Sequence, residues 1–492
     1  MAEPVPAPGE EGAAECAGRG WWGGGLRWSA EPVLLLCTLA LGLEEPLCTQ
    51  YLWHRLGEGG GAQNGTPPAA EAGAGCTNQS QGSGGAQEQE LEALVARWNL
   101  YLNLSGFLVG LFAVTLLGPW SDSVGRRSAL TLPALGMTLE AGIFLVVMYG
   151  QWPVGYLLVG RIVAGLSGDY NLVLAASFAY AADITTAPTR TFRVAVLEAC
   201  LGLAGMAASL AGGPWLRAQG YVAPFWMVFG TSLAATAYAA FILHESVAQP
   251  QPAKLLTTRH YRAVARLYVG PARKKLVLFT LAFFFVVTVH FGTRGLLVLF
   301  ELGSPLCWGP EMVGLGSAAS YLTFLSSLAA LRLLQKWMPE AWVAELGLLS
   351  NVSGLVVLSM AMTTTLMFTG YGLLFLSMTV TPILRAKLSR LVDETEQGAL
   401  FSAVACVEGL CSLGATGVFT ALYPATLPFM KGFPFLFGAI LLLLPAAIIG
   451  WIQIQDSKPE YRHFTDVAEP SPGPTDSGST VAENGSETSS TR

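Results

Sequence analysis

The chain has 492 residues and a net charge of −6, and 52% of its residues are hydrophobic while only 12% are charged. Soluble proteins carry about 25% charged residues, so this chain has too little charge to cover a water-facing surface. The composition therefore excludes a set of soluble domains and a generally disordered chain, and it favours a membrane protein. The acidic balance argues against a nucleic-acid-binding protein.

Apolar stretches of about 20 residues recur along the chain, and each is long enough to cross a bilayer as a helix. The hydropathy predicts twelve spans, at about residues 31–53, 95–119, 128–150, 153–183, 194–215, 221–243, 276–302, 312–336, 341–364, 366–390, 398–423 and 432–453. Six lie on each side of a basic segment, which predicts an all-α integral membrane protein with two six-helix bundles. This duplicated plan places a substrate site between the halves, near the midplane.

Charge orients the segments between the spans. The linker carries seven Lys and Arg residues against the single acid Glu245, which makes it cytoplasmic. The acidic, Gly-rich loop 55–92 holds sequons at Asn64 and Asn78, which predicts an extracellular, glycosylated loop. The predicted organisation is a disordered cytoplasmic N-terminus, a first bundle, a linker, a second bundle and a disordered cytoplasmic tail, at residues 1–30, 31–243, 244–275, 276–453 and 454–492.

This topology also sorts the cysteines. Cys76 in the first outer loop and Cys307 after the seventh span lie outside, where thiols can oxidise. We expect a Cys76–Cys307 disulfide that ties the two halves together, and two free thiols are the alternative.

The loop after the second span contains a specific motif. Residues 118–127 (GPWSDSVGRR) match the loop signature of the major facilitator superfamily at all its fixed positions. We expect Asp122 to favour a helix end or an arginine partner, and Arg126 to form a charge-assisted latch that holds one face closed. Alternatively, the arginines only anchor the topology. The corresponding loop at residues 336–341 lacks the motif, so we expect an asymmetric latch.

Within this superfamily, the chain resembles the folate-transporting members of the solute carrier 46 family, also known as haem/folate carriers. The resemblance runs from about residue 30 to 453. It rests on residues 49–55 (TQYLWHR), 106–112 (GFLVGLF), 288–292 (TVHFG), 385–389 (RAKLS), 394–406 (ETEQGALFSAVAC) and 430–435 (MKGFPF).

This resemblance implies import of folates, reduced folates and antifolates, driven by protons from an acidic exterior. The implied location is the plasma membrane, with both termini cytoplasmic and endosomal membranes as a second location. The partners are then the folates, protons and the lipid bilayer, with no nucleic acid, and a homo-oligomer is left open.

Ionisable groups inside spans are costly and supply the candidate site residues. Arg385 offers bidentate donors for the carboxylates of folate, and a structural ion pair is the alternative. Glu198 has no charged neighbour in its own span, so we expect it to carry the coupling proton; a permanently protonated packing residue is the alternative. His290 is either a packed core residue or, as the resemblance implies, a proton-coupling and folate-binding group.

The fourth span holds Arg161 and Asp169, which are eight residues apart and therefore lie near one face of a helix, beside Gly165 and Gly168. We expect Arg161 to bind substrate and set the potential of the cavity. Asp169 is expected to balance that charge, to bind the pterin or to take part in proton coupling. Close helix packing with one internal ion pair is the alternative.

The remaining candidates come from several spans. Asn103 offers an amide to the pterin edge or to an interhelical hydrogen bond, and Tyr321 and Glu408 are further substrate-site candidates. The position of Lys431 fits an extracellular gate or anchor. His260 lies in the basic linker, where we expect a role in gating. No role is assigned to the other ionisable residues in spans: Glu44, Glu45, Glu140, Arg294 and Glu345.

Two rivals stay open: an organic-anion or sugar carrier of the same fold, and a membrane receptor that transports nothing. We expect no enzyme, because no nucleophile–base pair or metal-ligand cluster occurs near one surface. No catalytic residue, metal site or cofactor is therefore predicted.

Overall fold

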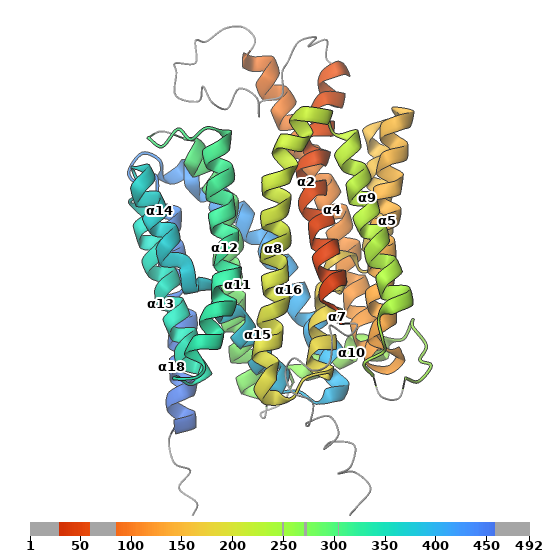
Figure 1. Ribbon diagram of the computed structural model, residues 1–492, viewed down its shortest axis with the longest axis vertical. Coiled ribbons are helices and arrows are strands. Elements are labelled where there is room, and N and C mark those ends of the chain that lie inside the picture. Colours follow the sequence, from red (N-terminus) through yellow and green to blue (C-terminus); the bar gives the residue numbers. More distant parts are fainter. Residues whose placement is uncertain (1–28, 60–84, 248–249, 270–272, 304, 458–492) are drawn as a thin grey trace, which may run out of the picture.

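The computed structural model describes residues 29–59, 85–247, 250–269, 273–303 and 305–457 (Figure 1). Twelve helical segments in these ranges are long and apolar enough to cross a membrane, which confirms the predicted spans. Helices suit a membrane because they satisfy every backbone hydrogen bond internally. Large apolar side chains such as Phe112 and Leu349 point outward, as expected for surfaces that face lipid. The sequons at Asn64 and Asn78 lie outside the described residues.

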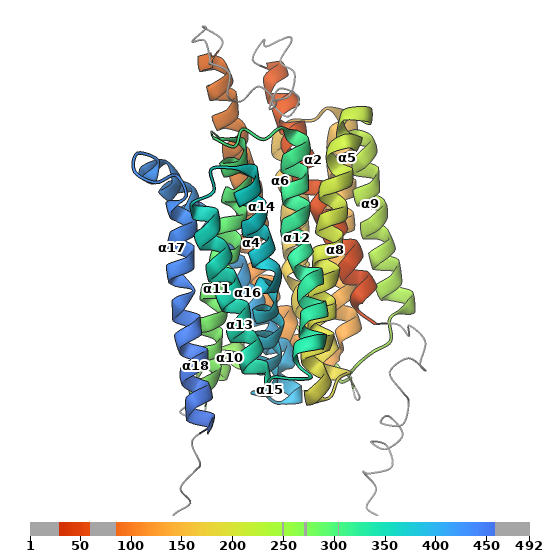
Figure 2. The same cartoon turned by 60° about the vertical axis from the view of Figure 1, so that its left-hand side comes forward.

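The helices run side by side in two groups (Figures 1 and 2). The first half consists of α2 (Glu31–Gly59), α4 (Gly85–Val124), α5 (Arg126–Gly150), α6 (Leu157–Leu166), α7 (Asp169–Asp183), α8 (Ala187–Gln219) and α9 (Val222–Ala237). The second consists of α11 (Lys274–Leu302), α12 (Pro310–Leu334), α13 (Glu340–Ser359), α14 (Thr364–Leu373), α15 (Val380–Arg390), α16 (Gln397–Thr426), α17 (Phe433–Leu441) and α18 (Leu443–Ser457).

The halves meet along four helix pairs. Helix α8 packs against α12 and α15, and α4 and α7 pack against α16. Small residues allow these close approaches: a Cβ atom at Gly118 would overlap Ser402, and one at Gly205 would overlap the ring of Tyr321. Phe178 of α7 stacks on Phe401 of α16 with ring centroids 5.9 Å apart. The apolar core of the first half thus continues into the second.

The linker folds against the bundle. Its helix α10 (Thr258–Leu267) packs on both α4 and α16, at the end of the molecule that we call the α10 end. His260 and Leu267 are its buried side chains. The hydroxyl of Tyr261 donates to the carbonyl of Phe112 at 3.3 Å. His260 was expected in a loop, but it lies in a helix, with Nε2 3.1 Å from the carbonyl oxygen of Lys254.

The fourth span is not one continuous helix, contrary to expectation. Helix α6 ends at Leu166 and α7 begins at Asp169, because Gly168 and Asp169 have φ angles of +101° and +54°. Glycine adopts this left-handed conformation easily, whereas an aspartate does so rarely. Gly165 packs closely on α4, since a Cβ atom there would lie 2.8 Å from the carbonyl oxygen of Gly106. The expected small-residue packing is therefore confirmed, but the expected single helix is wrong.

The tenth span is also interrupted, by a 3₁₀ segment at Leu374–Thr379 between α14 and α15. A side chain of α13 interrupts the backbone hydrogen bonds of the tenth span at this point. The hydroxyl of Ser350 donates to the carbonyl of Leu373 at 2.5 Å and accepts from the amide of Leu376 at 3.2 Å. Such insertion is a recognised cause of helix kinks. The interruption separates α14 from α15, the helix that carries Arg385.

Candidate functional site

Arg385 lies at the centre of a buried charge cluster between the two halves. Its Nε donates to Oε1 of Glu198 in α8 at 3.1 Å, and its NH2 donates to both carboxylate oxygens of Glu408 in α16, at 3.0 and 2.9 Å. The second oxygen of Glu198 accepts a 2.6 Å hydrogen bond from the hydroxyl of Thr381. The guanidinium group also lies over the rings of Phe178 and Phe283, at 4.2 and 5.0 Å.

This geometry changes the interpretation of Glu198. The residue was expected to be alone in its helix, and its charged partner comes from 187 positions away, in the other half. The Glu198–Arg385 pair therefore joins the halves, whereas the Glu408–Arg385 pair lies within the second half. In this conformation both carboxylates occupy the guanidinium, so Arg385 binds protein carboxylates rather than offering free donors.

A second buried cluster surrounds Arg161 in the first half. Its NH1 lies 3.1 Å from Glu140 of α5 and 3.8 Å from Glu44 of α2. Its NH2 donates to the amide oxygen of Asn103 at 3.2 Å. Phe107, one turn from Asn103 in α4, meets α16 at Gly409, so this face of α4 turns toward the other half. Asn103 itself is exposed.

The expected Arg161–Asp169 arrangement on one helix face is wrong, because the break at Gly168 puts the two residues on separate helices. Glu140 and Glu44 supply the ion pairs of Arg161. The carboxylate of Asp169 accepts from the backbone amide of Tyr170 at 2.7 Å, at the N-terminus of α7. Asp169 still contributes negative charge near Arg161.

His290 and Tyr321 form a third group, between α11 and α12. The His290 ring packs edge-on against Phe291 and Phe324, with centroids 5.5 and 5.9 Å away. One turn along α11, the guanidinium of Arg294 lies 3.8 Å from the centre of the Tyr321 ring. Because Tyr321 also packs on Gly205 of α8, this group borders the first half.

Lys431 and Cys307 lie at the opposite end from α10. The Lys431 ammonium lies 4.9 Å from the centre of the Phe300 ring, and burial lowers its pKa. Cys307 is disulfide-bonded and has a φ angle of +48°. Cys76 lies outside the described residues, so the pairing of the two remains a prediction.

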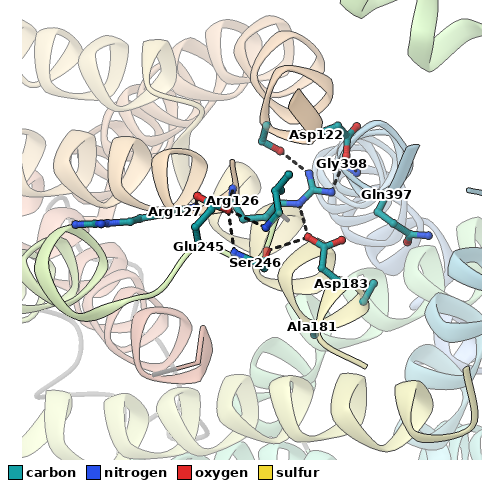
Figure 3. Close-up of polar contacts among 12 residues, drawn as sticks. Asp122, Arg126, Arg127, Ala181, Asp183, Glu245, Ser246, Gln397 and Gly398 are labelled. Atoms are coloured by element: carbon teal, nitrogen blue, oxygen red, sulfur yellow. Dashed lines mark hydrogen bonds and ion pairs between the residues drawn. The ribbon is translucent and has the colours of Figure 1, made fainter. Parts of the chain in front are cut away.

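The motif, which was expected in a loop, spans the end of α4, Gly125 and the start of α5, and it makes both contacts that its sequence suggested (Figure 3). The carboxylate of Asp122 accepts from the backbone amides of Gly398 and Ala399 at 2.7 and 3.1 Å, at the N-terminus of α16 in the other half. Arg126 is buried and donates to Asp122 at 2.6 Å and to Asp183 at 2.9 Å. The carboxylate of Asp122 is favourable at the start of α16 because the N-terminus of a helix is partly positive.

A residue from the start of the linker completes this cluster. The carboxylate of Glu245 accepts from the backbone amides of Arg126 and Arg127, at 2.6 and 3.1 Å, and so binds the N-terminus of α5 (Figure 3). Ser246 donates to Asp183 at 3.0 Å. The linker is thereby attached to the first half.

The second half makes its own contact at the α10 end, with residues that do not belong to the motif, so the closure differs between the two halves. Glu340, at the start of α13, accepts from the hydroxyl of Thr191 in α8 at 2.6 Å and from Arg390 of α15 at 2.7 and 3.0 Å. Nearby, Arg190 donates to the hydroxyl of Ser389 at 3.0 Å. Two sets of contacts, with different residues, thus close this end.

Sequence reasoning missed several of these residues. Glu44 and Glu140 are charged residues within spans, and no partner was expected for either of them. The available signal was Arg161, a residue of opposite charge in another span of the same half. Asp183 and Glu340 lie at predicted span ends, where charged residues are common, so nothing in the sequence distinguished them. Within the described residues, no group of three or more His, Cys, Asp and Glu side chains has the arrangement to hold a metal ion.

Comparisons with known proteins agree with this architecture. The sequence profile of the Major Facilitator Superfamily matches residues 91–416. A rat protein named proton-coupled folate transporter is 51% identical over 89% of this chain and 95% of its own length. A chicken protein named lysosomal proton-coupled steroid conjugate and bile acid symporter is 30% identical, over 86% and 93%. The crystal structure of the human organic anion transporter MFSD10 superposes with a TM-score of 0.64 at 17% identity, over 85% and 97%, which speaks for the fold alone.

Proposed function

Because this chain belongs to the major facilitator superfamily, we propose that it carries folates across a membrane by alternating access, together with protons. The strongest support is the 51% identity with a relative named proton-coupled folate transporter. The observation that carries the mechanism is the Arg385 cluster. An anion-binding guanidinium lies between the halves, and two carboxylates occupy it.

Protonation explains how such a site exchanges partners. A proton on Glu198 neutralises the carboxylate that joins Arg385 to the first half, and this weakens the charge-assisted bond. Arg385 is then available to a carboxylate of the substrate, which can accept hydrogen bonds from the guanidinium as Glu198 and Glu408 do here. Anion binding is therefore favoured when protons are abundant, and loss of the proton returns Glu198 to Arg385 and expels the anion.

The other candidates take supporting roles in this proposal. Asn103 lies on a face of α4 that turns toward the second half, and Arg161 of α6 donates to its amide oxygen, so both can contact the far end of the substrate. Tyr321, with His290 beside it on α11, provides aromatic and titratable surface at the border of the halves. Asp169 adjusts the charge around Arg161.

The orientation follows from the linker. Its basic residues favour a cytoplasmic α10 end, and an even number of spans then supports two cytoplasmic termini. The latch of Asp122 and Arg126 then closes the cytoplasmic side, so this conformation faces outward. His260 holds part of the linker at this gate, and Lys431 lies at the outer end. The plasma membrane is the proposed location, with glycans on Asn64 and Asn78 and a Cys76–Cys307 disulfide outside.

The rival substrate class is another organic anion. The 30% identical relative is named for steroid conjugates and bile acids, and a guanidinium between the halves suits their anionic groups as well. A competition experiment distinguishes the two substrate classes. At acid pH, excess unlabelled folate should abolish the uptake of a labelled folate, whereas a bile acid at the same concentration should leave most of that uptake intact.

The decisive experiment uses purified full-length protein in liposomes with an imposed pH gradient. We expect labelled folate to accumulate when the side of addition is acidic, and to equilibrate without accumulation when the pH is equal on both sides. Uptake that ignores the gradient would contradict proton coupling. No uptake of any folate at any pH, from protein that still binds folate, would favour a receptor.

A further inference from the structure

The Arg161 cluster contains more acid than its base can neutralise. The groups that face Arg161 come from four helices besides its own: Glu44 and Cys48 of α2, Asn103 of α4, Glu140 of α5 and Asp169 of α7. Glu44 and Glu140 are 2% and 1% exposed. With Glu44, Glu140 and Asp169 all ionised, three negative charges would surround one positive charge, a net −2 in the interior of a membrane protein.

Such an arrangement is costly unless a proton is bound. Charged groups within a membrane are expensive, and two adjacent carboxylates do not both ionise readily. Oε1 of Glu140 and Oε1 of Glu44 face the same nitrogen, NH1 of Arg161, at 3.1 and 3.8 Å, so the two carboxyl groups lie close together. Both oxygens are buried, and they share this one charged partner. Two carboxylates have no donor between them, so a hydrogen bond here requires that one carries a proton.

We propose that Glu44 and Glu140 form a second proton-binding site, beside Arg161 in the first half. This inference rests on the proposed function and deepens it. The proton comes from water on the acidic side, is held on one carboxyl oxygen of the pair, and returns to water on the other side. While bound, it removes one negative charge from the surroundings of Arg161, which makes that guanidinium a better partner for an anion.

The second half provides an independent parallel. Arg161 lies in the fourth span of the first half, and Arg385 lies in the fourth span of the second. Each guanidinium lies beside two carboxyl groups from neighbouring helices, Glu44 and Glu140 in one case and Glu198 and Glu408 in the other. The two arginines hold equivalent positions in the duplicated halves. Their carboxyl partners come from spans one and three in the first case and from spans five and eleven in the second.

The test measures how strongly folate accumulation depends on the pH gradient. In liposomes with the membrane potential clamped at zero, each coupled proton multiplies the attainable accumulation about tenfold for each pH unit of gradient. We expect the double variant Glu44→Gln, Glu140→Gln to lose about one factor of ten per pH unit relative to the unaltered protein. Glu45→Gln is the matched control, because Glu45 is adjacent in α2 but exposed, and it should change nothing. An unchanged dependence in the double variant would overturn the proposal.

A second measurement does not depend on transport. The infrared carbonyl band of protonated carboxyl groups in the unaltered protein should contain a component that disappears as the pH is raised and that is missing from the double variant. Glu140→Asp, which keeps a carboxyl group, should shift this component and serves if the glutamine variants do not fold. A spectrum without this component would refute the second site even if folate transport is normal. Normal titration of the pair in a protein that transports no folate would refute only the proposed function.

Discussion

The contact between Asp122 and the N-terminus of α16 offers the clearest quantitative prediction. The substitution Asp122→Asn keeps the size of the side chain but removes its charge. The carboxylate accepts backbone hydrogen bonds from Gly398 and Ala399 across the interface. A hydrogen bond to a charged group contributes about 1.5–3 kcal/mol, and one between neutral groups about 0.5–1.5 kcal/mol. An asparagine side chain has a single acceptor oxygen, so it keeps one of the two bonds in weaker form and loses the other.

The expected loss is therefore about 3 kcal/mol, made up of about 1 kcal/mol at the retained bond and about 2 kcal/mol at the lost one. A difference of this size changes the equilibrium between closed and open forms of the α10 end about 100-fold. The change favours the open form because these two bonds exist only when α4 and α16 are in contact.

Distances between spin labels can measure this shift. Ser128 in α5 and Thr395 just before α16 are exposed and lie in different halves, so labelled cysteines at these positions report the separation of the halves at the α10 end. We expect Asp122→Asn to increase the long-distance population strongly. Asp456→Asn is the control: Asp456 pairs with Lys275 at 2.5 Å within the second half alone. Identical distance distributions for Asp122→Asn and the unaltered protein would refute the role of this contact.

Four further predictions concern the central cluster and the interface. Glu198→Gln keeps a hydrogen-bonding side chain next to Thr381 and Arg385 but cannot titrate. The exchange rate of labelled folate at equal pH should therefore stay within about tenfold of the unaltered rate, while gradient-driven accumulation is lost. Unchanged accumulation would show that Glu198 does not couple protons to transport. In Arg385→Lys, the lysine cannot bind both Glu198 and the two oxygens of Glu408. The affinity for folate, measured by thermal stabilisation, should therefore fall about 10- to 100-fold. An unaltered affinity would exclude Arg385 from the substrate site. Glu340→Gln should open the α10 end less than Asp122→Asn, because Glu340 accepts one hydrogen bond across the interface, from Thr191, whereas Asp122 accepts two. Labels that show no change would indicate that this contact carries no gating energy. Gly118→Ala should separate α4 from α16, because its Cβ would overlap the side chain of Ser402 and lie 2.8 Å from the carbonyl oxygen of Gly398. Adding Ser402→Gly removes the larger overlap and should restore part of the unaltered distances; a double variant no closer than the single one would mean that the overlap with Ser402 is not the cause.

Hydropathy alone was sufficient to predict the twelve spans, because the length of an apolar stretch depends on the thickness of the bilayer and on little else. The breaks within spans were harder to predict. The Gly168–Asp169 break has a local signal in its glycine, whereas the break after α14 depends on Ser350, a residue of another helix. Similarly, the motif pointed to Asp122 and Arg126, but their partners at residues 183, 245 and 398 depend on the tertiary structure.

The same reasoning explains the mixed outcome for the candidate site. The arginines and glutamates of the site were identifiable because charge within a span is rare and costly. Which carboxylate meets which guanidinium was not identifiable, because Glu198 and Arg385 are 187 residues apart and come from different halves. A single sequence shows which residues carry unusual chemistry, and only the packing of the helices shows how they are paired.

The position of α10 has a kinetic consequence. An unattached linker of about 30 residues would span on the order of 100 Å and would not hinder the halves. Here the linker is attached to the first half through Glu245, while α10 lies across α4 and α16 with Leu267 buried. Separation of those two helices requires α10 to leave at least one of them. Exposure of one leucine costs about 2 kcal/mol, which slows a step about thirtyfold if the exposure occurs at the transition state. The linker would then limit the turnover rate without any contact with the substrate.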